Sequence, residues 1–235
     1  MKSEEFTRNI RPAVLSNKNF NKIFVVGYNK TGTTTMEQVL RLYGYSMPHQ
    51  QEQEARLTKQ VFCTNYDEFR SFVSKFDAFQ DLPFSQDQTY VVADVLFPNS
   101  RFILTERDSE QWFTSMINFT KKIFNLSQVD NLTEKDLLTK FRYLYPGYLH
   151  NNHRRILTNF NKGNKLETRW DKLFDKDYYI QMYEERNNQI KKYFMGSTGK
   201  LLVIDVSEEK DTESICRFLN IPAELIVKMP HENKS

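Results

Sequence analysis

The residues best suited to chemistry lie in the segment GYNKTGTTT, residues 27–35. Gly27 and Gly32 allow tight backbone turns, so that consecutive N–H groups can converge on an anion. A helix predicted to begin at Thr33 would add its unpaired N–H groups and the positive end of its dipole. Further donors come from the hydroxyls of Thr31, Thr33, Thr34 and Thr35. The segment therefore predicts an anion-binding loop; a glycine turn whose threonines only cap a helix is the alternative.

The position of the lysine indicates which anion the loop holds. Gly27 and Gly32 have the spacing of the nucleotide-hydrolysing pattern G-x-x-x-x-G-K-[ST], but Thr33 stands where that pattern has its lysine. The lysine of this chain comes earlier, at Lys30. A kinase or ATPase built in this way would lack its usual phosphate clamp. A cation inside the loop suits a donor whose terminal group needs less neutralisation, although a P-loop kinase of a small molecule or nucleotide stays open.

The loop resembles the 5′-phosphosulfate loop of sulfotransferases that use 3′-phosphoadenosine 5′-phosphosulfate (PAPS), whose core reads P-K-[ST]-G-T-[TS]. Asn29 stands at the proline of that pattern and Thr35 at a frequent tryptophan, and neither change removes an anion donor. The resemblance implies that the loop binds the 5′-phosphosulfate through Asn29, Lys30, Thr31, Gly32, Thr33, Thr34 and Thr35. It also implies that Lys30 is catalytic, because negative charge develops on the oxygen that leaves the sulfur.

A second segment, FILTERDSEQWFTS at residues 102–115, strengthens the resemblance. Sulfotransferases bind the 3′-phosphate with an arginine after a strand and a serine eight residues later on the next helix. Arg107 and Ser115 have this spacing, and a guanidinium is well shaped for bidentate binding of phosphate. Taken alone, an arginine near a helix start is usually a surface charge. Together with the loop it predicts a site for the 3′-phosphate.

The acceptor hydroxyl needs a general base, and Asp81 is the first candidate. The segments DLPF at 81–84 and ADVLFPNSRFILTERD at 93–108 are similar to a subfamily of small sulfotransferases with a D-x-P element. The resemblance implies that Asp81 is the base, and partial burial would help by raising its pKa. A helix cap before Pro83 is the alternative reading, and Asp94 is the second candidate. None of the histidines follows a predicted strand in the right segment: His49, His150, His153 and His231.

The elements that must position these residues alternate between strand and helix. Buried strands are predicted at 22–26, 76–80, 102–105 and 201–204, and a helix from Thr33 to about Gly44. Residues 90–97 are ambiguous and are read as a crossover helix, a further helix is expected to begin near Asp108, and 119–200 is expected to be mostly helical. This order predicts an α/β fold with a P-loop-type parallel sheet covered by helices on both faces. The loops that follow the strands, with Lys30, Asp81 and Arg107, would share one edge. We expect one sulfotransferase-like domain over 1–235, with a polar extension at 1–20.

Composition narrows the class of protein. The 19 Phe and 12 Tyr among 235 residues argue against disorder. The net charge of +3 is too small for a typical nucleic-acid-binding protein. Cys63 and Cys216 lie far apart and are predicted to be buried free thiols, as in a reducing compartment. The polar start MKSEEFTRNI and the lack of a long apolar run predict a cytoplasmic protein without a membrane span.

The sequence thus predicts an in-line, metal-free sulfuryl transfer from PAPS to the hydroxyl of a small molecule, with adenosine 3′,5′-bisphosphate as product. A non-catalytic nucleotide-binding protein is a further alternative. The acceptor and the oligomeric state are left open, since fold and donor site do not fix them.

Overall fold

The structure, a computed structural model, describes residues 2–230. The chain divides into two compact units, one formed by residues up to Arg107 together with those from Asn187, the other by Asp108–Arg186. The first unit contains the sheet and the predicted anion-binding loop. The single domain expected over 1–235 stays a prediction.

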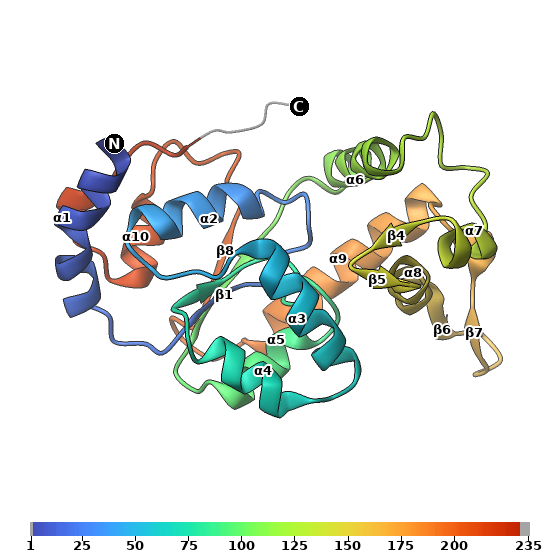
Figure 1. The fold of residues 1–235 in the computed structure, drawn as a ribbon, viewed down its shortest axis with the longest axis horizontal. Coiled ribbons are helices and arrows are strands. Elements are labelled where there is room, and N and C mark those ends of the chain that lie inside the picture. Colours follow the sequence, from blue (N-terminus) through green and yellow to red (C-terminus); the bar gives the residue numbers. More distant parts are fainter. Residues whose placement is uncertain (1, 231–235) are drawn as a thin grey trace. The chain divides into compact units, whose positions relative to one another are not determined.

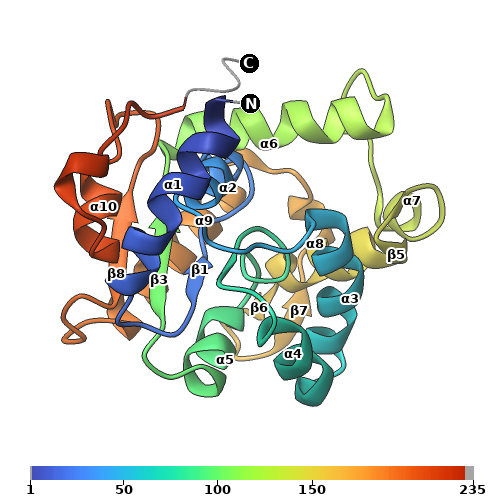
Figure 2. The same cartoon turned by 60° about the vertical axis from the view of Figure 1, so that its left-hand side comes forward.

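The first unit is built on a parallel sheet with the strand order β2-β1-β3-β8. Phe24 pairs with Phe79 on one side and with Phe102 on the other, and Leu104 pairs with Val203. Figure 2 shows β8, β3 and β1 side by side. The predicted α/β fold is confirmed. The strands are β1 Ile23–Val25, β2 Ala78–Phe79, β3 Arg101–Thr105 and β8 Leu201–Ile204.

Helices cover both faces of this sheet. Figure 1 shows α1, α2 and α10 on one face and α3, α4 and α5 on the other. The bounds are α1 Lys2–Ser16, α2 Thr33–Leu42, α3 Gln50–Phe62, α4 Tyr66–Val73, α5 Thr89–Leu96, α9 Lys176–Tyr193, α10 Glu213–Leu219 and the 3-10 turn η2 Ala223–Leu225. The latter part of α9 belongs to this unit and packs Ile190 into its core.

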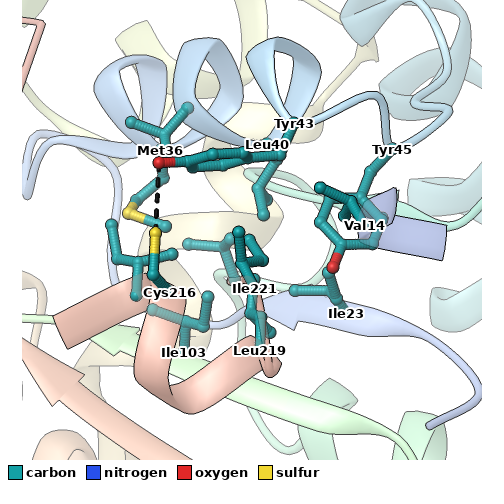
Figure 3. Close-up of a cluster of buried hydrophobic side chains, with 14 of the residues drawn as sticks. Val14, Ile23, Met36, Leu40, Tyr43, Tyr45, Ile103, Cys216, Leu219 and Ile221 are labelled. Carbon is teal, nitrogen blue, oxygen red and sulfur yellow. Dashed lines mark hydrogen bonds between the residues drawn. The ribbon is translucent and has the colours of Figure 1, made fainter. Parts of the chain in front are cut away.

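One core cluster lies between the sheet and α1, α2 and α10 (Figure 3). Strand residues at alternate positions, Ile23, Val25 and Ile103, point into it, because side chains of a strand alternate between the faces. Ile10 and Val14 of α1 are buried in the same cluster. The segment predicted as a polar extension therefore contributes a helix to the core.

The other face is aromatic. Phe24 lies with its ring centroid 5.6 Å from that of Phe79 and 5.4 Å from that of Phe102, so one ring from each of three neighbouring strands forms a row. Phe69 and Phe72 of α4 are buried in the same cluster. Because apolar side chains leave the sheet on both faces, its strands read as continuous apolar runs in the sequence.

Most predicted elements of the first unit are confirmed, with small changes of length. The ambiguous segment 90–97 is helical as read and forms α5. The strand expected at 76–80 shortens to Ala78–Phe79, because only these two residues pair with β1. Of the two cysteines, both free, Cys216 is buried but Cys63 is exposed, so the prediction of burial is wrong for Cys63.

The second unit was expected to be mostly helical and also contains two short antiparallel hairpins. Its core joins helices through aromatic contacts: the ring centroids of Trp112 and Tyr183 lie 4.3 Å apart, and His153 Nδ1 lies 2.8 Å from the Tyr179 hydroxyl. The elements are α6 Ser109–Phe124, α7 Glu134–Thr139, β4 Arg142–Tyr143, β5 Tyr145–Pro146, α8 Tyr148–Leu157, β6 Thr158–Phe160, β7 Leu166–Thr168, η1 Trp170–Lys172 and the first part of α9.

Candidate active site

The loop between β1 and α2 is pressed against the ends of the neighbouring strands. A Cβ atom added to Gly27 would lie 2.1 Å from the Thr105 Oγ1 and 2.3 Å from the Thr105 backbone oxygen. A Cβ added to Gly32, whose φ is +91°, would lie 2.1 Å from Val206 Cγ2. Both glycines are therefore required, the first for the close approach of β3 and the second also for its left-handed backbone.

The threonines of the loop have different environments. The Thr31 hydroxyl donates to the Tyr28 carbonyl at 2.5 Å and lies 2.7 Å from the Thr105 hydroxyl. It is thus engaged inside the protein, where it ties the loop to the end of β3. Thr33 and Thr35 are also buried, whereas Thr34 is exposed. The predicted donor-binding roles of Thr33, Thr34 and Thr35 stay predictions.

The loop reaches Asp81 through Asn29, the residue before Lys30. Lys30 has a φ of 72° and is half-buried in the loop. Its charge is near enough to lower the pKa of Asp81. Next to it, Asn29 Nδ2 donates a hydrogen bond of 2.6 Å to Asp81 Oδ1. The loop and the D-x-P element are therefore joined at one edge of the sheet, where β1 and β2 end in parallel.

Asp81 follows β2 in a left-handed conformation with a φ of 61°, before a cis Leu82–Pro83 peptide bond. Its side chain caps no helix in the described chain, because the next helix, α5, begins only at Thr89. The helix-cap alternative is therefore wrong. Burial raises the pKa of Asp81 to about 6. Hydrogen bonds from the Leu82 backbone and Asn29 oppose the rise, the charge of Glu37 adds to it, and that of Lys30 opposes it.

Polar residues of α2 and α3, which carry no motif in the sequence, complete the surroundings of Asp81. Gln50 Nε2 donates to Asp81 Oδ2 at 3.2 Å and to Glu54 Oε1 at 2.8 Å. Glu54 is 4% exposed, and burial together with the charge of Asp81 raises its pKa to about 7, against the hydrogen bond from Gln50. Glu37 of α2 accepts from Gln80 Nε2 at 3.1 Å. For the two residues of α3, the sequence signal is the spacing of polar residues along that helix, whose buried positions are largely polar.

Arg107 lies just beyond β3, two positions after the Thr105 that contacts the loop. Because β1 and β3 are parallel neighbours, Arg107 and Lys30 both follow strands at the same edge. Helix α6 begins where expected, and its N-cap Asp108 accepts a 3.0 Å hydrogen bond from the Gln111 backbone. Ser115 lies on α6 in the second unit, and its role in binding the 3′-phosphate stays a prediction.

The other candidates lie elsewhere. Asp94 forms an ion pair of 2.6 Å with Lys200, which directly precedes β8 and so belongs to the opposite edge of the sheet. The structure therefore does not favour Asp94 as the base. His153 is buried against Tyr179, and burial lowers its pKa to about 4. His150 stacks on Trp170 in the second unit, His49 is exposed just before α3, and His231 lies outside the described residues.

Two further properties concern residues 2–230. Across this range no helix combines the length and the apolar character needed to cross a bilayer. In the same range, no group of three or more His, Cys, Asp or Glu side chains is arranged to hold a metal ion. The metal-free reaction stays a prediction.

Comparison with known protein families agrees with this geometry. A family model described as "Sulfotransferase domain" matches residues 22–235, which include the loop, Asp81 and Arg107. The chain belongs to the sulfotransferase family. A search of curated proteins found no match. Membership of this family favours sulfotransferase chemistry over the kinase alternative. The loop agrees, because Thr33 stands where the kinase pattern has its lysine.

Proposed function

We propose that this sulfotransferase moves a sulfuryl group from PAPS to the hydroxyl of a small molecule in the cytoplasm. The observation that carries the proposal is the 2.6 Å hydrogen bond from Asn29 to Asp81, which joins the phosphosulfate-type loop to a buried carboxylate beside Lys30. Group transfer to a hydroxyl requires a donor site and a general base close to each other. The free state of Cys63 and Cys216 supports a reducing location.

In this proposal the donor is bound through its two anionic ends. Residues 29–35 hold the 5′-phosphosulfate with backbone N–H groups, the threonine hydroxyls that face it and the N-terminus of α2. Arg107 holds the 3′-phosphate, for which a guanidinium provides two parallel donors. The part of Ser115 stays a prediction from the sequence. The loops with Lys30 and Arg107 follow β1 and β3, which are parallel neighbours, so this assignment agrees with the sheet topology.

The chemical step is an in-line displacement at sulfur. The acceptor oxygen forms its bond to sulfur while the bond between sulfur and the 5′-phosphate oxygen breaks, and adenosine 3′,5′-bisphosphate leaves with that electron pair. Lys30 stabilises the charge that develops on the leaving oxygen, and Asp81 takes the proton of the hydroxyl. With a pKa of about 6, Asp81 is ionised at pH 7 and more basic than an ordinary aspartate. A sulfuryl group carries less charge than a terminal phosphate, so no Mg²⁺ is invoked.

The first test is turnover of labelled PAPS with a panel of hydroxylated compounds. Lys30→Ala should lower kcat about 100-fold or more, the size of effect that loss of one transition-state donor has in other enzymes. Lys75→Ala is the matched control, because Lys75 is exposed in the same unit and lies outside the site. PAPS consumption equal in wild type and Lys30→Ala would contradict the proposal.

The second test separates the classes of nucleotide. By calorimetry, wild type should bind adenosine 3′,5′-bisphosphate without metal more tightly than ATP with Mg²⁺. Arg107→Ala should weaken binding of the bisphosphate about tenfold or more, since a charge-assisted bidentate contact is lost. A preference for ATP with Mg²⁺ would favour the kinase alternative. Tight bisphosphate binding without any turnover over the whole panel would favour a non-catalytic binding protein.

A further inference from the structure

We propose that Asn29 is a positioning residue for the base, which orients the Asp81 carboxylate so that its Oδ2 atom receives the proton of the acceptor. This inference rests on the proposed function and assigns to Asn29 a role beyond contact with the donor. It concerns the place in the loop where the resembling motif has a proline, a residue without any side-chain donor.

The hydrogen bonds of Asp81 distinguish its two oxygens. Oδ1 accepts from the Leu82 backbone N–H at 2.8 Å and from Asn29 Nδ2 at 2.6 Å. Oδ2 accepts only the longer hydrogen bond of 3.2 Å from Gln50 Nε2, among the described residues. An oxygen with two short hydrogen bonds has less capacity left for a proton than one with a single long bond. Oδ2 is therefore the more basic oxygen.

The same contact connects base and donor loop mechanically. Asn29 directly precedes Lys30, so a loop that places Lys30 on the leaving oxygen also places the amide that holds Asp81. When the acceptor oxygen bonds to sulfur and the old sulfur–oxygen bond breaks, its proton passes to Oδ2. Asp81 then returns that proton to solvent. Correct positioning of a reacting group within about an ångström is worth large factors in rate.

The groups around Asp81 allow a test with opposite signs. Among the described residues, the charges of Lys30 in the loop and Glu37 of α2 act on the pKa of Asp81, and Asp81 in turn acts on that of Glu54 of α3. The hydrogen bond from Asn29 lowers the pKa of Asp81, so Asn29→Ala should raise it. The charge of Glu37 raises the same pKa, so Glu37→Gln should lower it. A loosened loop that let water reach Asp81 would instead lower its pKa in Asn29→Ala, because burial is what raises it.

The experiment measures kcat/KM against pH and, separately, the titration of Asp81 by carboxyl ¹³C NMR, with the resonance assigned from its loss in Asp81→Asn. In Asn29→Ala, both the acid limb of the profile and the NMR midpoint should move up by about one pH unit or less. We expect kcat to fall about tenfold or more. Affinity for adenosine 3′,5′-bisphosphate should change less than kcat does. Glu37→Gln should move both midpoints down. If Asn29→Ala does not fold, Asn29→Ser replaces it in the same measurements.

The outcomes separate the two levels of the proposal. An unchanged NMR midpoint in Asn29→Ala, or a loss confined to donor affinity, would overturn the positioning role. A shifted NMR midpoint with an unmoved rate profile would overturn Asp81 as the base and with it the role of Asn29. If wild type transfers nothing from PAPS, the proposed function fails. The NMR titration then still decides whether Asn29 holds Asp81.

Discussion

Replacement of Asp81 by asparagine should remove activity and yet stabilise the folded protein at neutral pH. Burial raises the pKa of Asp81 from its ordinary value of 3.8 to about 6, with Glu37 adding to the rise. An acid with a raised pKa keeps its proton longer in the folded than in the unfolded chain. The contribution of Asp81 to stability is therefore fully present below about pH 4 and is lost as pH rises through about 6.

The size of this loss follows from the two values. A difference of about two pKa units corresponds to about 3 kcal/mol in the free energy of unfolding. The wild type loses this stability once Asp81 is ionised. The asparagine side chain of the variant carries no charge, but its amide group would meet the Gln50 donor that now lies 3.2 Å from Oδ2. That conflict costs on the order of 1 kcal/mol. We expect Asp81→Asn to be about 1 to 2 kcal/mol more stable than wild type at pH 7.5.

Urea unfolding followed by circular dichroism, at half-unit steps between pH 4 and 7.5, measures this difference. The advantage of the variant should be absent near pH 4 and grow up to about pH 6. An advantage independent of pH, or a variant less stable than wild type at pH 7.5, would refute the reasoning. PAPS turnover of Asp81→Asn at a near-normal rate would refute the base assignment independently.

Asp77→Asn is the matched control of opposite sign. Burial alone would raise the pKa of Asp77, but hydrogen bonds from Lys18 at 2.8 Å and from Ser46 outweigh it, and the pKa is lowered. An acid with a lowered pKa stabilises the fold above its unfolded pKa, and this contribution is lost as pH falls. Asp77→Asn should therefore be less stable than wild type at pH 7.5, by a margin that shrinks toward acid pH.

Two further predictions follow from the geometry of the sheet edge. Gly27→Ala should lower stability by about 1 to 3 kcal/mol, because its Cβ would lie 2.3 Å from the Thr105 backbone oxygen. Gly163→Ala is the control, because a Cβ added there would meet its nearest atom at 3.3 Å, and it should change the thermal midpoint of unfolding little. Equal midpoints for the two variants would contradict the close approach of β3 to Gly27. Asp94→Asn should keep PAPS turnover within about twofold of wild type, because Asp94 pairs with Lys200 at the other edge. A loss like that of Asp81→Asn would restore Asp94 as a candidate base.

The sequence alone was sufficient for the parts whose signals are local. Three consecutive segments carry such signals: a buried apolar strand, the loop with Gly27 and Gly32, and a helix from Thr33. Because they are neighbours in the chain, they could be predicted without any knowledge of tertiary contacts. Parallel pairing also followed, since strands joined by helices cannot form hairpins. From these two facts, Lys30, Asp81 and Arg107 could be placed after strands at a common edge.

Only the tertiary structure decided which side chains meet there. Asn29 and Asp81 are 52 positions apart, and their contact depends on the register of β1 and β2 and on the left-handed turn at Asp81. Gln50 and Glu54 carry no motif, because a buried polar face on α3 resembles a solvent-exposed face in the sequence. The ion pair with Lys200 made Asp94, the second candidate, the less favoured base. A helix between two parallel strands runs from one edge of the sheet to the other, so the far end of α5 lies away from the loops. The environment that sets the pKa of Asp81 is assembled from separate segments, and no one of them reveals it.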